Sequence, residues 1–334
     1  MSCVKPSTKL KTNRSCQMKN NSRIVKFFDC IVDSYCYDKA SGAAMTLPSR
    51  TLLELLRQID TYNRSSPYYR KNRKDTETWH IADIEIDSQG AKAVILFSRS
   101  DRAAADQAVS DPDSSHFSVA AKLGRQGNAS SSHLAILLNP VKPNVYMTVL
   151  EDAIGISTRD IESMLALITR KARIANKAFF QVNDPSGIVR NAKYKFAFVG
   201  HPSDDFKAEL EDSTINGIEL SDLSARNQNF DDDGYTIERG KVIKLSLKDK
   251  EFSIWDALKS VGQRATKEQL SSLRVKFTDK GQSSYTVELD ASTMRLVHED
   301  RYVKKVRIEN FSTRLDTGSE RIIPEIRDKL FALI

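Results

Sequence analysis

The run WHIADIEIDSQGAKAVILFS, residues 79–98, indicates the fold class of this chain. Apolar and polar residues alternate over 79–87, which is the pattern of a strand with one buried face. A second apolar run at 91–98 follows a short turn at Ser88–Gly90. The two runs therefore predict an antiparallel hairpin.

Hairpins and short strands dominate the rest of the chain. HLAILLN (133–139) and VYMTVLED (145–152) predict a second hairpin, whose turn is stiffened by two prolines. Further strands are predicted at 23–37, 178–182, 192–200, 215–220, 241–247, 272–278, 284–290 and 301–311, and amphipathic helices at 46–62, 157–178, 203–212, 253–262 and 322–334. Strands outnumber helices, so the sequence predicts an α+β fold with mostly antiparallel sheets, built from hairpins with a few packed amphipathic helices.

The most regular helix is predicted at 157–178. Ser157 or Thr158 can cap it, and acidic residues come early while basic residues come late, as the helix dipole favours. One face is apolar and is predicted to be buried: Ile161, Met164, Leu165 and Ile168.

The chain has 334 residues, which is enough for two domains with hydrophobic cores. We expect a disordered basic tail at 1–22, an N-terminal α+β domain at 23–185, and a C-terminal α+β domain at 190–334 that ends in a helix. The formal net charge is +7, and residues 1–28 contain seven Lys and Arg and no acid. The remaining chain holds 44 basic against 44 acidic residues, so local clusters, not overall charge, must indicate a binding surface.

Several classes of function have no motif in this chain. No Gly-rich phosphate loop, nucleophile elbow or HExxH metal motif is present, and none of the four cysteines is spaced as CxxC. We therefore predict no cofactor, no metal and no catalytic residue. No apolar run reaches the roughly 18 residues of a membrane span, and the basic N-terminus lacks the apolar core of a secretory signal. The sequence thus predicts a cytoplasmic protein without membrane association.

Basic clusters interleaved with aromatic residues are the positive signal. Cations attract phosphates, and aromatic rings can stack on unpaired bases. The stretch 62–80 combines tyrosines with arginines and lysines, the helix at 157–178 carries cations at i, i+3 and i+7, and the last strand carries two cations on one face. The predicted nucleic-acid-binding residues are Arg64, Tyr68, Tyr69, Arg70, Lys71, Arg73, Lys74, Arg170, Arg173, Lys177, Lys305 and Arg307. No base-reading motif accompanies them, so we predict nucleic-acid binding that is independent of sequence, and these residues leave DNA and RNA both open.

Two other functions stay open from the sequence. The first is a protein-interaction or homodimerisation module that uses the exposed hairpins and the apolar stripe of the C-terminal helix: Ile322, Ile326, Leu330 and Phe331. That stripe can equally pack in the protein's own core. The second is a metal-dependent nuclease, since Asp83, Glu85 and Asp87 share one face of a strand and three carboxylates can hold Mg²⁺. The same carboxylates can also be the solvated outer face of a hairpin.

Two longer stretches resemble a known family in the order of their elements. They are LAILLNPVKPNVYMTVLEDAIG (134–155), followed by a helix, and KYKFAFVGHPSDDFKAELEDSTINGIEL (193–220). This order resembles the RexA phage-exclusion proteins of lambdoid prophages, and uncharacterised bacterial proteins found near phage-defence genes. The resemblance covers roughly residues 45–225. It implies a cytoplasmic, dimeric, sequence-independent DNA binder that takes part in antiphage defence.

Overall fold

A computed structural model describes residues 21–37, 44–110, 113, 116–221, 242–246, 253–297 and 301–334. The predicted α+β class is confirmed: these residues form five helices and eighteen strands, and every strand pair between them is antiparallel. Most of the predicted tail, residues 1–20, lies outside the described residues, as do residues 222–241, which include the first residue of the strand predicted at 241–247.

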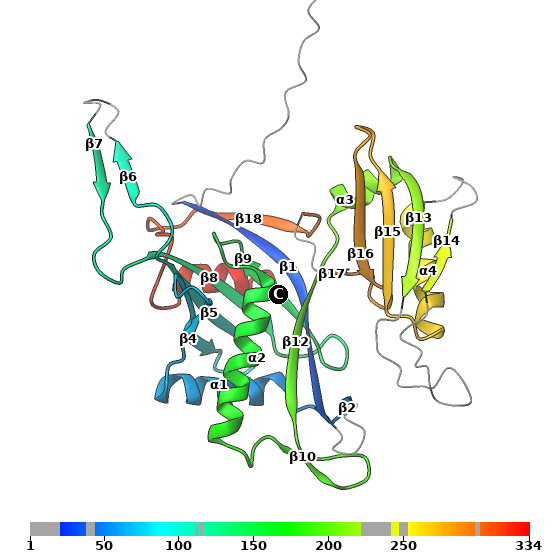
Figure 1. Cartoon of the computed structure of the whole chain (residues 1–334), viewed down its shortest axis with the longest axis horizontal. Helices are drawn as coiled ribbons and strands as arrows, with labels where there is room; N and C mark the ends of the chain where they lie inside the picture. Colours follow the sequence, from blue (N-terminus) through cyan, green and yellow to red (C-terminus); the bar gives the residue numbers. More distant parts are fainter. Residues whose placement is uncertain are drawn as a thin grey trace, which may run out of the picture.

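One large sheet runs through the molecule (Figure 1). Its centre is β1 (Ser22–Tyr37), which pairs with β9 (Val145–Glu151) on one side and β12 (Lys193–Gly200) on the other. Beyond β9 lie β8 (Asn128–Leu137), β5 (Lys92–Asp101), β4 (Glu77–Ile86) and β3 (Arg70–Lys71). Beyond β12 lie β17 (Leu296–Val297), β16 (Ser284–Asp290), β15 (Ser272–Thr278), β13 (Thr214–Ser221) and β14 (Val242–Leu245). The short strands β2 (Ala44–Thr46) and β18 (Lys305–Glu309) also pair with β1.

Both predicted hairpins are present. The first consists of β4 and β5, and the second of β8 and β9. The alternation of 79–87 breaks once, at a bulge between Ile81 and Asp83. Two smaller ribbons stand apart from the large sheet: β6 (Gln107–Ser110) with β7 (Phe117–Ala120), and β10 (Gln181–Asn183) with β11 (Val189–Asn191).

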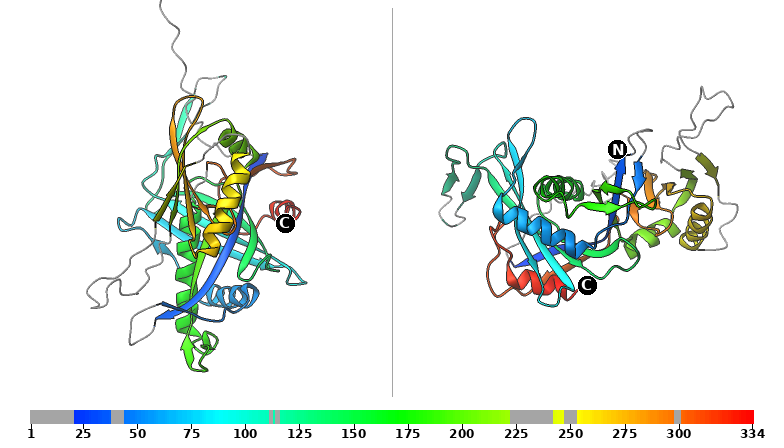
Figure 2. Two further views of the ribbon diagram at one scale, coloured as in Figure 1. Left: turned by 90° about the vertical axis from the view of Figure 1, so that its right-hand side faces the viewer. Right: turned by 90° about the horizontal axis from the view of Figure 1, so that it is seen from below.

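Helices cover both faces of the sheet around β1. The helices α1 (Leu52–Ser65) and α2 (Thr158–Ala175) pack on the face that carries Phe28 and Cys30. The helix α5 (Pro324–Phe331) packs on the opposite face, against Val25 and Phe27 (Figure 2). This part of the protein is therefore a three-layer helix–sheet–helix arrangement.

A second lobe lies beyond β12. There, β13, β15 and β16 pack against α3 (Asp204–Glu211) and α4 (Ile254–Lys267), and Phe206 and Phe277 are fully buried between them (Figure 1). β12 follows the predicted boundary near residue 190, yet it pairs with β1 over eight positions. The division into two domains stays a prediction.

The helix predictions need three corrections. The helix expected from residue 46 begins at Leu52, because Thr51 forms a capping box with Glu54. The helix expected at 157–178 has its predicted cap at Ser157 but ends at Ala175. Asn176 caps the C-terminal end of this helix. Its side-chain oxygen accepts a hydrogen bond from the backbone N–H of Phe179, and its side-chain nitrogen donates one to Gln58 of α1. The helix expected at 253–262 continues to Lys267.

A buried polar network ties the sheet to the chain end. The Arg23 guanidinium donates to the Glu151 carboxylate at 2.7 Å, and Nδ1 of His133 lies 2.6 Å from the same carboxylate. Nε2 of His133 accepts the backbone N–H of Ile323 at 3.1 Å, which makes Nδ1 the donor to Glu151. All three side chains are almost fully buried, so they hold β1, β8 and β9 in register with the segment before α5.

A second buried carboxylate joins the two lobes. Asp29 of β1 lies 2.9 Å from Nε2 of His201 and accepts a hydrogen bond from Arg295 at 2.7 Å. Burial acts to raise the pKa of Asp29, but the hydrogen bonds and charges of its two partners outweigh it and hold that pKa below its usual value. The charged form of Asp29 is therefore part of the folded state.

Candidate nucleic-acid interface

The predicted basic loop lies against α2. The ring of Tyr68 is partly buried on the main core, and Nζ of Lys171 sits 4.8 Å from its centroid. Arg70 approaches Asp160 in the first turn of α2, at 3.6 Å. The two basic clusters of the sequence, around residue 70 and around residue 171, thus meet on one face of the protein.

The cations of this loop differ in whether an acidic side chain pairs with them. Arg64 and Lys71 pair with Asp60 and Asp75 at 2.8 and 2.9 Å, in exposed i,i+4 pairs. Such pairs contribute little to stability and can be exchanged for a phosphate. The neighbouring Arg73 and Lys74 are exposed and make no ion pair with another described residue.

Arg70 is held more firmly than its neighbours. Its guanidinium lies 5.1 Å from the centroid of Trp79, and that of Arg99 lies 5.9 Å from the same ring. Trp79 is buried, so both contacts are shielded from water and are of the cation–π type. Arg70 therefore positions the loop as well as contributing charge to it. Tyr69, by contrast, is half exposed and lies 4.9 Å from the ring of His80.

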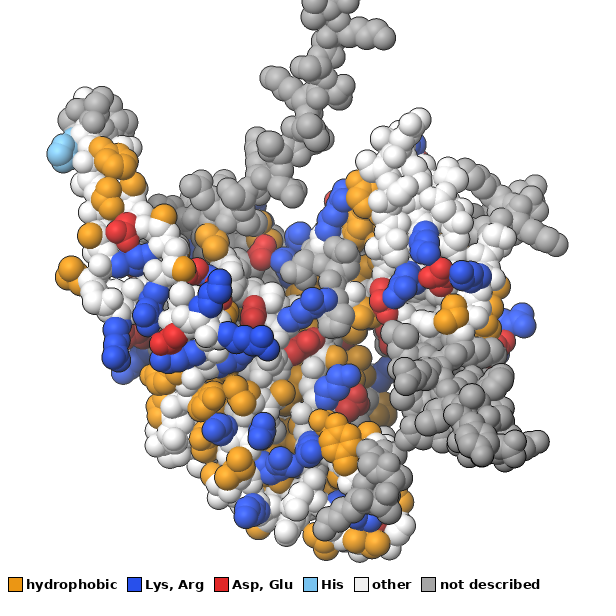
Figure 3. Space-filling model, viewed as in Figure 1, with side chains coloured by type: hydrophobic (Ala, Val, Ile, Leu, Met, Phe, Trp, Pro, Cys, Tyr) orange, Lys and Arg blue, Asp and Glu red, His pale blue; other side chains and the backbone are white. Residues whose placement is uncertain are grey.

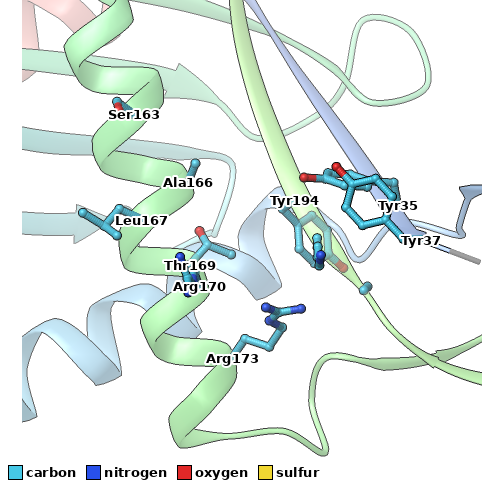
Figure 4. A pocket seen from close by; sticks show the side chains of 11 residues that line it. Tyr35, Tyr37, Ser163, Ala166, Leu167, Thr169, Arg170, Arg173 and Tyr194 are labelled. Atoms are coloured by element: carbon cyan, nitrogen blue, oxygen red, sulfur yellow. The ribbon is translucent and has the colours of Figure 1, made fainter. Parts of the chain in front are cut away.

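A cavity of about 590 Å³ opens between α2 and the strands β1 and β12 (Figure 4). Two predicted residues, Arg170 and Arg173, line it from α2, and Lys193 lines it from β12. Figure 4 shows Arg173 extending from the helix toward Tyr194. Three tyrosines, Tyr35, Tyr37 and Tyr194, also line it, and no Asp or Glu is among the lining residues in the described ranges.

The tyrosine pair of this cavity is fixed by strand geometry. Tyr35 and Tyr37 lie on the same face of β1, and their rings meet edge to face at 5.6 Å. Burial, together with the neighbouring Tyr37, raises the pKa of Tyr35, while the charge of Arg173 acts in the opposite direction. The phenol of Tyr35 therefore stays neutral at physiological pH and can donate a hydrogen bond.

Lys193 is placed by the register of β1 and β12. Tyr35 pairs with Lys193 across the two strands, and Nζ of Lys193 lies 4.3 Å from the centroid of Tyr37. On the other face of β12, the Tyr194 hydroxyl accepts the backbone N–H of Arg50 at 3.3 Å. Burial raises the pKa of Tyr194, so this ring too is neutral at physiological pH.

Of the twelve predicted residues, Arg170 and Arg173 alone line the cavity, and three of the others lie neither at the cavity nor in the basic loop. Lys177 is exposed in the turn after α2, because the helix ends before it. Lys305 and Arg307 are exposed on β18, where Lys305 pairs with Lys26 of β1. A rise of about 3.3 Å per residue places Lys26 roughly 30 Å from Tyr35 along that strand. The structure therefore does not bring β18 to the cavity.

The carboxylates that suggested a nuclease do not form a shared site. Asp83 accepts the backbone N–H groups of Ile84 and Ile322, and Asp87 accepts that of Ala91 in the hairpin turn. Glu85 pairs with Arg327 of α5. Within the described ranges, no group of three or more His, Cys, Asp or Glu side chains is arranged to hold a metal ion. The acidic face of this hairpin is instead covered by the C-terminal segment.

Sequence reasoning missed five residues of this region: Tyr35, Tyr37, Lys171, Lys193 and Tyr194. Four of them lie on strands that were predicted, but nothing in the sequence showed that the end of β1 and the start of β12 would meet beside α2. Figure 3 shows Lys and Arg side chains gathered over the face of the molecule that carries α2.

Comparison with known proteins identifies no family model, no curated protein and no solved structure that matches this chain. In the described part of the chain, no helix has both the length and the apolar character needed to cross a membrane.

Proposed function

We propose that this protein binds nucleic acid, without reading its sequence, through a surface centred on α2. We define this α2 surface by its cations from the loop, the helix and β12, which are Arg73, Lys74, Arg170, Lys171, Arg173 and Lys193. Tyr35, Tyr37 and Tyr68 lie among them. The observation that carries the proposal is the cavity whose described lining residues include three cations and three tyrosines but no carboxylate.

Cations and aromatic rings bind different parts of a nucleic acid. Lys and Arg attract the phosphate backbone and release its bound counterions, which makes the affinity fall with salt. Aromatic rings stack on bases that are not paired, and they accept any base. The α2 surface offers both, so a single-stranded segment is the ligand that it fits best.

A binding assay over a range of salt concentrations tests this proposal. We expect the wild-type protein to bind single-stranded DNA or RNA more tightly than duplexes. Replacing Arg73, Lys74 and Lys171 with Gln is expected to weaken binding at least tenfold, because three phosphate contacts are lost. The matched control replaces Arg264, Lys267 and Lys280, which are exposed cations of the second lobe. Equal affinities for the wild type and the first variant would contradict the proposal.

A second candidate function is homodimerisation through the β6–β7 ribbon. This ribbon stands away from the body of the protein in Figure 1, and all eight of its residues are exposed. Phe117 and Val119 lie on one face of it, with exposed fractions of 62% and 50%. An isolated two-stranded ribbon is only marginally stable in water, so a second copy of the chain is a fitting partner for this apolar face. Sedimentation velocity of the wild type and of a Phe117→Ser, Val119→Ser variant tests it: a dimer that dissociates on substitution supports it, and a monomeric wild type contradicts it.

The C-terminal helix does not offer such a surface. Ile326 and Leu330 are buried against β1, β8 and β9, and Ile322 packs on Val94 and Leu96. Of the two roles open to this stripe from the sequence, packing in the protein's own core is the one observed.

The cytoplasmic location and the antiphage role are further proposals. The antiphage role is supported by the resemblance in element order over residues 45–225, and sequence-independent binding of single strands is compatible with it. Phage plating on cells with and without this protein tests the role. A plating efficiency that the protein does not change, across a panel of phages, would contradict it.

A further inference from the structure

Cationic and aromatic side chains line the cavity beside α2, and they come from three separate segments of the chain. The end of β1 contributes two tyrosine rings, α2 contributes two arginines, and β12 contributes a lysine. Its volume of about 590 Å³ falls in the range of small-molecule sites, which is roughly 300–1,000 Å³. A phosphate ion alone would occupy only a small part of it.

The cations of this cavity are not neutralised from within. Arg170, Arg173 and Lys193 make no ion pair with another residue of the described chain, and the lining residues that the structure describes include no carboxylate. Arginine donates two parallel hydrogen bonds to a phosphate or carboxylate, and lysine adds a point charge. The two arginines therefore make the α2 side of the cavity selective for an anion, and Lys193 adds a positive charge beside the tyrosine pair, with its Nζ 4.3 Å from the centroid of Tyr37.

The opposite side selects a flat, uncharged ring. Tyr37 is half exposed, and its ring and that of Tyr35 stand perpendicular to one another. Ala166 and Leu167 of α2 add apolar side chains to the lining. Tyrosine faces stack on bases of either kind, since every base has a π-face.

We propose that this cavity holds one nucleotide, with its base against Tyr35 and Tyr37 and its phosphate between Arg170, Arg173 and Lys193. This inference rests on the proposed function and extends it from a charged surface to a defined site. The nucleotide is either a free nucleoside monophosphate or one unit of a bound strand, since both present one base and one phosphate to the site. A strand is the natural extension, because Lys171 points from the same helix toward Tyr68 and the basic loop.

Isothermal titration calorimetry tests the site with four probes: AMP, adenosine, phenyl phosphate and a ten-nucleotide oligo(dT). The variants are Tyr37→Ala, whose side chain is half exposed, and Lys193→Gln. Arg264→Gln on α4 is the control, because it removes one exposed charge far from the cavity. Circular dichroism confirms that each variant is folded.

The proposal predicts that AMP binds at least tenfold more tightly than adenosine, and that both variants weaken AMP and oligo(dT) about tenfold while the control does not. If phenyl phosphate binds and AMP does not, the site serves an aryl phosphate such as a phosphorylated tyrosine, and the proposal is overturned. If oligo(dT) binds the wild type and both variants equally, the site is overturned while the α2 surface stands. If AMP binds as predicted but oligo(dT) does not, the site is supported for free nucleotides and the proposed function is overturned.

Discussion

Removing the three cavity cations together is expected to flatten the salt dependence of nucleic-acid binding by a predictable amount. The perturbation is the triple variant Arg170→Gln, Arg173→Gln and Lys193→Gln, which deletes three positive charges and keeps three polar side chains. None of the three residues forms an ion pair with another described residue, so no partner carboxylate is left unpaired. Effects on folding should therefore be small.

The magnitude follows from counterion release. Each phosphate contact contributes about 0.7 to the slope of log K against log salt for a single strand. The three cations surround one phosphate in the proposed site, so their loss should make that slope shallower by about 0.7. Fluorescence anisotropy with a labelled oligo(dT), between low and moderate salt, measures both slopes directly.

A matched variant separates a local contact from a general loss of charge. Replacing Arg264, Lys267 and Lys280 with Gln changes the net charge by the same amount, but these residues lie on α4 and near β15 in the second lobe. We expect its slope to equal that of the wild type. The reasoning is refuted if both triple variants flatten the slope equally, or if neither does.

Three further predictions concern the fold that carries the site. Leu330→Ala should lower the free energy of unfolding by about 2–5 kcal/mol in urea, because this fully buried side chain packs α5 on the sheet, and a loss below 1 kcal/mol would contradict that packing. Glu151→Ala should cost about 3–5 kcal/mol in the same assay, since it leaves a buried guanidinium without its carboxylate, and a near-neutral effect would show that the network is dispensable. Asp29→Asn should be destabilising at neutral pH, and the difference from the wild type should shrink only as the pH falls below about 4, through the lowered pKa of Asp29. A difference that grows on acidification would have the wrong sign for this ion pair.

Local sequence patterns were sufficient to predict the five helices and the long strands of this fold, but not the short strands β2, β3, β6, β7, β11 and β17. The hairpin at 79–98 alternates as a half-buried strand pair should, and the helix after Ser157 has both its cap and its apolar stripe where the sequence placed them. Predictions were wrong where a single side chain decides a boundary. Thr51 and Asn176, one at the start of α1 and one at the end of α2, each set a helix end by a hydrogen bond that periodicity does not reveal.

The candidate site was only partly accessible from the sequence. Arg170 and Arg173 stand out because they repeat along a helix, whereas Tyr35 and Lys193 lie 158 positions apart and meet only through the pairing of β1 with β12. Contacts of this kind depend on sheet order, which one sequence does not specify. For the same reason Lys305 and Arg307 were grouped with the other cations, although β18 pairs with the opposite end of β1.

The most direct test of the central claim is photo-crosslinking of a bromouracil-substituted oligonucleotide to the full-length protein, with the crosslinked peptides identified by mass spectrometry. Bromouracil reacts with aromatic side chains that stack on it. The α2 surface predicts crosslinks at Tyr35 or Tyr37 and at Tyr68. Crosslinks confined to Tyr285 and Tyr302 of the second lobe, or a complete lack of them under conditions in which the oligonucleotide binds, would contradict the claim.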